Sequence, residues 1–99
     1  MAWVPFEYRD FYDIPRIFVV RHDNELFLFD CRFSPHADDY SSRFDVYALP
    51  ASLEDSLGKI SWEGLSAAGR AVGSVETSSV EFDDSQRRLV NDEVFAKIK

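Results

Sequence analysis

The sequence has very little cysteine and few glycines. Cys31 is its single cysteine, so no internal disulfide can form, which agrees with a reducing compartment. The four glycines are not clustered, and this excludes the glycine-rich loop that cradles a phosphate. The chain also lacks the CxxC and HExxH patterns and the serine elbow of hydrolases. We therefore expect neither an enzyme nor a cofactor.

Long apolar runs are lacking as well. No run is longer than that of Ile17–Val20, with four residues, whereas a membrane-spanning helix needs about 20. The N-terminus has no basic region followed by an apolar stretch, the pattern of a secretory signal. These features predict a cytoplasmic protein with no membrane partner.

Basic residues are in deficit. Eleven Lys and Arg stand against 18 Asp and Glu, which gives a formal net charge of −7. A chain of this sign is repelled by nucleic acid and by anionic lipid. The small basic group of Arg70, Arg87 and Arg88 is better explained by local ion pairs. The expected partner is therefore another protein or a second copy of the chain, and not a nucleic acid.

Aromatic residues, in contrast, are abundant. Nine Phe, four Tyr and two Trp account for 15% of the chain. Large rings bury much area each, so a small domain can build a dense core from them. A chain of 99 residues is the usual size of one compact domain. We expect a single β-rich domain over residues 1–99.

The clearest structural signal is a β-hairpin. Residues 16–21 and 25–33 are rich in β-branched and aromatic residues, and the turn formers His22, Asp23 and Asn24 separate them. Side chains alternate between the two faces of a strand. One face of the second strand then carries Phe27, Phe29, Cys31 and Phe33. We predict that this Phe face lies in the core.

Further strands are predicted at residues 43–49, 70–82 and 87–90, and the second of these should bend near Gly73 or at residues 77–79. Alternation of apolar and polar residues is the basis of each of these predictions.

Helical signals are short. Residues 52–57 predict one helical turn, and Ser61 is a candidate N-cap for a helix over residues 62–68. A last helix should begin after Asn91 or Asp92 and close an open end of the sheet. The predicted fold class is mainly β, with α+β possible. It is a strongly twisted antiparallel sheet or a small, partly open barrel with a short C-terminal helix.

The nearest approach to a metal or catalytic cluster lies within nine residues. Its members are Cys31, His36, Asp38 and Asp39. A metal site needs several suitable ligands at fixed geometry, and the Cys31 thiol should point into the core. His36 and Asp38 therefore remain candidates for weak binding of a divalent ion, against the plainer interpretation of a solvated acidic loop.

One face of the predicted sheet needs cover. If the Phe face is the core, Leu26 and Leu28 lie on the opposite face with Ile17 and Val19 beside them. Either the N-terminal segment or the Trp62 region packs over this face, or a partner docks there. The expected rim residues are Tyr8, Tyr12, Tyr40 and Tyr47.

These properties favour a protein-binding module. Carboxylates beside tyrosines complement a basic cleft, because opposite charges speed encounter and buried tyrosines supply affinity. A bacterial immunity protein, or an inhibitory or accessory subunit, acts in this way. The expected contact residues are Asp38, Asp39, Tyr40, Tyr47 and Tyr12. The alternative is a small-ligand-binding domain or enzyme that uses a pocket in the barrel mouth near His36 and Asp38.

Overall fold

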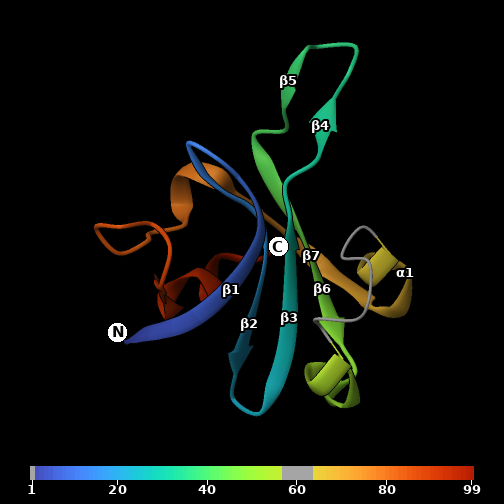
Figure 1. Cartoon of the computed structure of the whole chain (residues 1–99), viewed down its shortest axis with the longest axis vertical. Helices are drawn as coiled ribbons and strands as arrows, with labels where there is room; N and C mark the ends of the chain where they lie inside the picture. Colours follow the sequence, from blue (N-terminus) through green and yellow to red (C-terminus); the bar gives the residue numbers. More distant parts are fainter. Residues whose placement is uncertain (1, 57–63) are drawn as a thin grey trace.

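The structure is a computed structural model that describes residues 2–56 and 64–99. Within these residues, six strands form one antiparallel sheet in the order β7-β6-β3-β2-β1-β8 (Figure 1). Their bounds are β1 Trp3–Tyr12, β2 Ile14–His22, β3 Glu25–Asp30, β6 Arg43–Leu49, β7 Arg70–Glu76 and β8 Leu89–Asn91. The prediction of a mainly β, antiparallel fold is confirmed. Because β7 and β8 are the two edges of this sheet, it is not closed into a barrel.

Tight turns connect the first three strands. Asp23 and Asn24 have φ of 51° and 64°, and two such residues in a row suit the two-residue turn that matches the twist of a hairpin. The predicted hairpin is confirmed, and its register pairs Phe18 with Phe29. Asp13 has a φ of 61° and joins β1 to β2 in a second hairpin.

The Phe face of the sheet forms the main core. Phe18, Phe29 and Phe44 are fully buried. The ring of Phe18 stacks on Phe29 with centroids 4.7 Å apart and forms a T-shaped pair with Phe44 at 5.3 Å. Such pairs contribute about 0.5–1.5 kcal/mol each beyond the burial of their area. The predicted core position of Phe29 and Cys31 is confirmed, since both are buried.

A small hairpin projects beyond the main sheet. β4 (Phe33–Ser34) pairs with β5 (Asp39–Tyr40), and Figure 1 shows them standing clear of the other strands. The prediction that Phe33 belongs to the core is wrong. β3 ends at Asp30 and the chain leaves the sheet before Phe33, whose side chain is 48% exposed.

The opposite face, which carries Leu26 and Leu28, is covered by the chain itself. These side chains are buried in a second cluster with Leu65 from α1 (Leu65–Ala68), and Leu53 from the 3₁₀ helix η1 (Ala51–Ser56) packs against that cluster. Figure 1 shows η1 and α1 on the same side of the sheet. Burial of each leucine contributes about 1.5–3 kcal/mol. Of the alternatives offered for this face, the N-terminal segment does not cover it, because it forms β1. Trp62 and the candidate N-cap Ser61 lie outside the described residues.

The long strand predicted over residues 70–82 is interrupted. β7 ends at Glu76, and the 3₁₀ turn η3 (Thr77–Ser79) follows it at one of the two predicted bends. Beyond η3, Phe82 forms a single bridge with Val90 in β8. The chain after β7 therefore reaches the strand at the opposite edge of the sheet.

The C-terminal helix is a 3₁₀ helix, η4 (Asp92–Lys97). Of the two candidates Asn91 and Asp92, Asn91 is the cap, because its side-chain oxygen accepts the backbone N–H of Glu93 at 3.0 Å. The ring of Phe95 packs on Phe27 at 5.1 Å, so η4 covers part of the Phe face. No helix in the described part of the chain is long and apolar enough to cross a membrane.

Gly73 permits the C-terminal residues to pair with β7. It has a φ of +148°, and a Cβ at this position would lie 2.6 Å from the Lys99 carbonyl oxygen. Ser74 and Lys99 exchange two backbone hydrogen bonds of 2.9 Å. We predict that Gly73→Ala lowers the free energy of unfolding by about 1–3 kcal/mol, because the new side chain strains the backbone and displaces Lys99.

Urea denaturation measures this loss. The matched control is Gly64→Ala, because Gly64 has a φ of −91° and open space around its Cβ position. Equal stability of the Gly73 variant and the unmodified protein would contradict the pairing.

Candidate functional site

Arg16 in β2 joins three segments of the chain. Its side chain is 11% exposed. The Nη2 group donates to the Asp13 carboxylate at 2.6 Å, Nε to the Tyr12 carbonyl at 3.0 Å and Nη1 to the Cys31 sulfur at 3.4 Å. The guanidinium also lies 4.5 Å from the ring centroid of Tyr40. Arg16 thus connects the β1–β2 turn to Tyr40 in β5 and to Cys31, the residue that follows β3.

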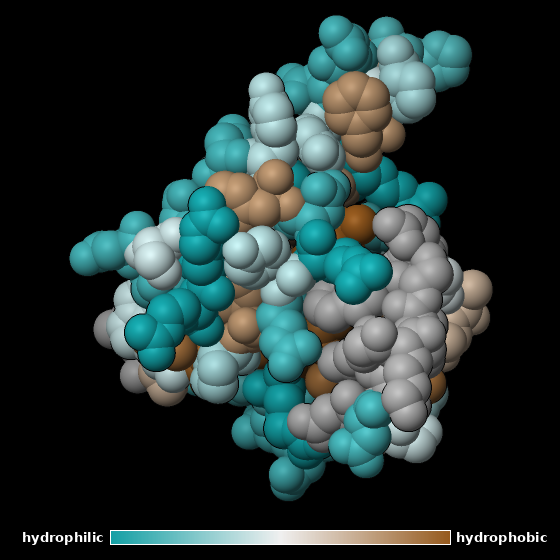
Figure 2. Space-filling view, in the orientation of Figure 1, coloured by the Kyte–Doolittle hydropathy of each residue, from teal (hydrophilic) through white to brown (hydrophobic). Residues whose placement is uncertain are grey.

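Three aromatic side chains lie in a row at this end of the sheet. Tyr12 stacks on Tyr40 with centroids 5.6 Å apart, and Tyr40 and Phe33 form a T-shaped pair with centroids 5.2 Å apart. Tyr12 is 64% exposed, and Phe33 is nearly half exposed. We call Tyr12, Phe33 and Tyr40 the aromatic row. Figure 2 shows apolar atoms standing among hydrophilic residues on the projecting hairpin.

Carboxylates surround the aromatic row. The Tyr40 hydroxyl donates to Asp10 at 3.5 Å, and Asp39 accepts the backbone N–H of Tyr40 at 2.7 Å. Asp38 is exposed in the turn before β5. Within residues 2–56 and 64–99, no ion pair joins Asp10, Asp38 or Asp39 to a cation. This surface therefore presents aromatic rings beside carboxylates that no cation of the described residues neutralises in an ion pair.

The environment of Tyr40 keeps its hydroxyl protonated. Desolvation raises the pKa of Tyr40, and the neighbouring Asp10 carboxylate raises it further. The hydroxyl therefore acts as a hydrogen-bond donor at neutral pH.

The structure brings together four of the five residues that the sequence singled out for partner binding. Tyr12, Tyr40, Asp38 and Asp39 all lie at the β1–β2 turn or on the β4–β5 hairpin. Tyr47 does not join them, because it packs against the Leu26 and Leu28 cluster on the other face of the sheet. The expected rim of tyrosines around the leucine cluster is therefore wrong for Tyr8, Tyr12 and Tyr40: Tyr8 and Tyr40 pack against the Phe face, and Tyr12 stacks on Tyr40.

Sequence reasoning missed Arg16, Asp13 and Phe33. The spacing of Asp13 and Arg16 around Pro15 was the available signal, since a tight turn brings such a pair together. The contacts of Arg16 with Cys31 and Tyr40 depend on the pairing of distant segments, which the sequence did not reveal.

The suggested metal ligands are not assembled. Among residues 2–56 and 64–99, no group of three or more His, Cys, Asp or Glu side chains is placed to hold a metal ion. His36 is exposed in the turn between β4 and β5, whereas Cys31 is buried. The other histidine, His22, stacks on Phe95 at 4.1 Å.

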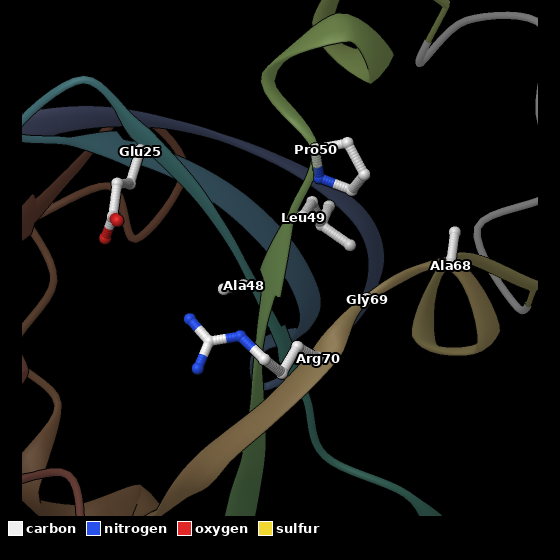
Figure 3. A pocket seen from close by; sticks show the side chains of 7 residues that line it. All are labelled: Glu25, Ala48, Leu49, Pro50, Ala68, Gly69 and Arg70. Atoms are coloured by element: carbon white, nitrogen blue, oxygen red, sulfur yellow. The ribbon is translucent and has the colours of Figure 1, made fainter.

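Two surface hollows of about 380 Å³ each lie elsewhere on the described surface. The first is lined by Glu25, Ala48, Leu49, Pro50, Ala68, Gly69 and Arg70. In Figure 3 the polar ends of Glu25 and Arg70 turn to one side of β6, and Leu49 and Pro50 turn to the other. The second lies beside η4, between Arg43 and Lys97. Neither hollow is lined by His36 or Asp38, the residues near which a ligand pocket was predicted. The buried Phe side chains pack together on one face of the sheet.

Comparison with family models, curated proteins and solved structures finds no match to this chain.

The Cys31 thiol is a hydrogen-bonding group of the interior. It is 2% exposed and donates to the Ser41 carbonyl oxygen at 3.1 Å. Burial raises the pKa of Cys31, and this effect outweighs the opposite influence of Arg16. The thiol is therefore protonated at neutral pH, which makes a nucleophilic role unfavourable.

We predict that a disulfide reagent at pH 8 modifies Cys31 at least about tenfold more slowly in the native protein than in the urea-unfolded protein. Burial limits access to the thiol, and its raised pKa lowers the fraction of reactive thiolate. The control carries Cys31→Ser with Ser42→Cys, which places a thiol on an exposed residue. This control should react at similar rates in both states. Fast modification of native Cys31 would show that the thiol is accessible.

Proposed function

We propose that this domain binds a basic partner protein through the aromatic row and the carboxylates of Asp10, Asp38 and Asp39. The observation that carries the proposal is the exposure of Tyr12 and Phe33 on a support that Arg16 holds in place. Binding of this kind is how an immunity protein or an inhibitory or accessory subunit works.

The side chains of the row suit a protein interface. Aromatic residues are enriched at the centres of interfaces, and they dominate the energy of many of them. Tyr12 and Tyr40 are already stacked, so little side-chain freedom is lost when a partner packs on them. The entropy cost of fixing these two rings on binding is therefore small.

The charges select the partner. The net charge of the chain is −7, and Asp38 and Asp39 stand on the exposed hairpin beside the row. A positive partner surface would be attracted over a distance of roughly 10 Å at moderate salt. Binding should therefore weaken as the salt concentration rises.

The face that carries Leu26 and Leu28 is a poorer candidate. Leu53 and Leu65 pack over it, so its apolar surface is already buried. This argues against docking of a partner or of a second copy on that face, and it leaves the aromatic row as the better surface.

The experiment begins with capture of a partner by the tagged protein from lysate of its own source.

Calorimetry with the purified partner then compares the affinities of two charge variants. Asp38→Asn with Asp39→Asn should weaken binding about tenfold or more, because it removes the two carboxylates of the hairpin beside the aromatic row. Glu81→Gln with Asp84→Asn changes the net charge equally on the loop before β8 and should leave affinity nearly unchanged.

A second pair of variants tests the aromatic contribution. Phe33→Ser should weaken binding about tenfold or more, since it removes a ring from the row. Trp3→Ser removes a ring that is 43% exposed on β1 and should have little effect. Equal losses from site and control variants, or no loss from either site variant, would contradict the proposed surface.

A further inference from the structure

Tyr12 presents one open ring face to solvent. Its other face stacks on Tyr40, with 28° between the ring planes, while 64% of the side chain remains exposed. The face of an aromatic ring is negative, so it attracts a cation placed over it within about 6 Å of the centroid. The free face of Tyr12 can therefore receive a cationic group from outside.

A carboxylate stands next to this ring. Asp13 follows Tyr12 directly in the turn, and its side chain is 66% exposed. Its Oδ1 accepts the hydrogen bond from Arg16, and the hydrogen bonds of the described residues leave Oδ2 available. A group that stacks on Tyr12 and donates in its own plane can use ring and carboxylate together.

The chain already uses this chemistry twice. The guanidinium of Arg16 lies over Tyr40 and donates to neighbouring oxygen atoms. The guanidinium of Arg87 lies 4.2 Å from the ring centroid of Phe11 and donates to the Tyr8 hydroxyl at 3.0 Å. In both places a guanidinium lies over a ring and also donates hydrogen bonds to neighbouring oxygen atoms.

We propose that Tyr12 and Asp13 form a site for an arginine side chain of the basic partner. This inference rests on the proposed function and names the group that the aromatic row recognises. The guanidinium stacks on the free face of Tyr12 and donates to the Asp13 carboxylate, and the field of Asp10 adds to its attraction. Lysine fits less well, because its compact ammonium cannot stack and make in-plane hydrogen bonds at once.

Hexa-arginine and hexa-lysine are the probes. Titration of the full chain with each peptide, followed by nuclear magnetic resonance, gives the two dissociation constants. Both peptides carry the same charge, so the ratio of the constants isolates the contribution of the guanidinium. We expect hexa-arginine to bind about fivefold more tightly or better, with the largest signal changes at residues 10–13 and 40.

Substitutions of Tyr12 identify the ring. Tyr12→Leu should reduce the arginine-to-lysine ratio to about one, and Tyr12→Phe should retain it, because the stacking face is kept. Trp3→Leu, at another exposed ring, should leave the ratio unchanged. The side chain of Tyr12 is largely exposed, and an unchanged amide spectrum checks that each variant is folded.

The outcomes separate the two proposals. Equal binding of the two peptides, or a preference that survives Tyr12→Leu, overturns the arginine site. If the captured partner still depends on Asp38, Asp39 and Phe33 in that case, the proposed function stands without it. A ratio that falls with Tyr12→Leu, together with a partner that binds this variant more weakly, supports both.

Discussion

The burial of β2 and β3 on both faces is the constraint on which the structure depends. These strands carry Phe18 and Phe29 on one side and Val19 and Leu28 on the other, and all four side chains are buried. A short chain must therefore supply two covering layers. η4 and the segment before β8 lie over the first face, and η1 and α1 lie over the second. Within residues 2–56 and 64–99, few residues remain to cover the ends of the hairpins.

The aromatic row occupies one of these uncovered ends. Only Tyr40 packs against the main core, whereas Tyr12 and Phe33 are exposed. Arg16 supports the row, because it binds the β1–β2 turn, Cys31 and the face of Tyr40. A guanidinium suits this task because it offers donors in one plane and a stacking face perpendicular to them. The same arrangement leaves the outer face of Tyr12 open, so the interaction that builds the surface also exposes the ring that a partner can meet.

The features that could be predicted from the sequence are those that depend on residues close together in the chain. Turn formers at Asp23 and Asn24 and alternation in β3 located the first hairpin, and the Phe face followed from them. The predictions were wrong where contacts between distant segments determine the end of a strand or the position of a side chain. Phe33 continues the alternation of β3, yet the strand ends at Asp30. Tyr12 and Tyr40 were assigned to the surface, but their stacking depends on a hairpin that packs against a turn far away in the chain, and local patterns carry no information about that contact.

Solvent accessibility measured on the free protein tests the central claim most directly, namely that the chain covers its leucine face and exposes the aromatic row. A soluble nitroxide broadens the resonance signals of accessible protons. We expect strong broadening of the ring signals of Tyr12 and Phe33, while the methyl signals of Leu26 and Leu28 stay sharp. Broadening of these methyl signals to the same extent as the ring signals would show that the leucine face is open, and would contradict the account.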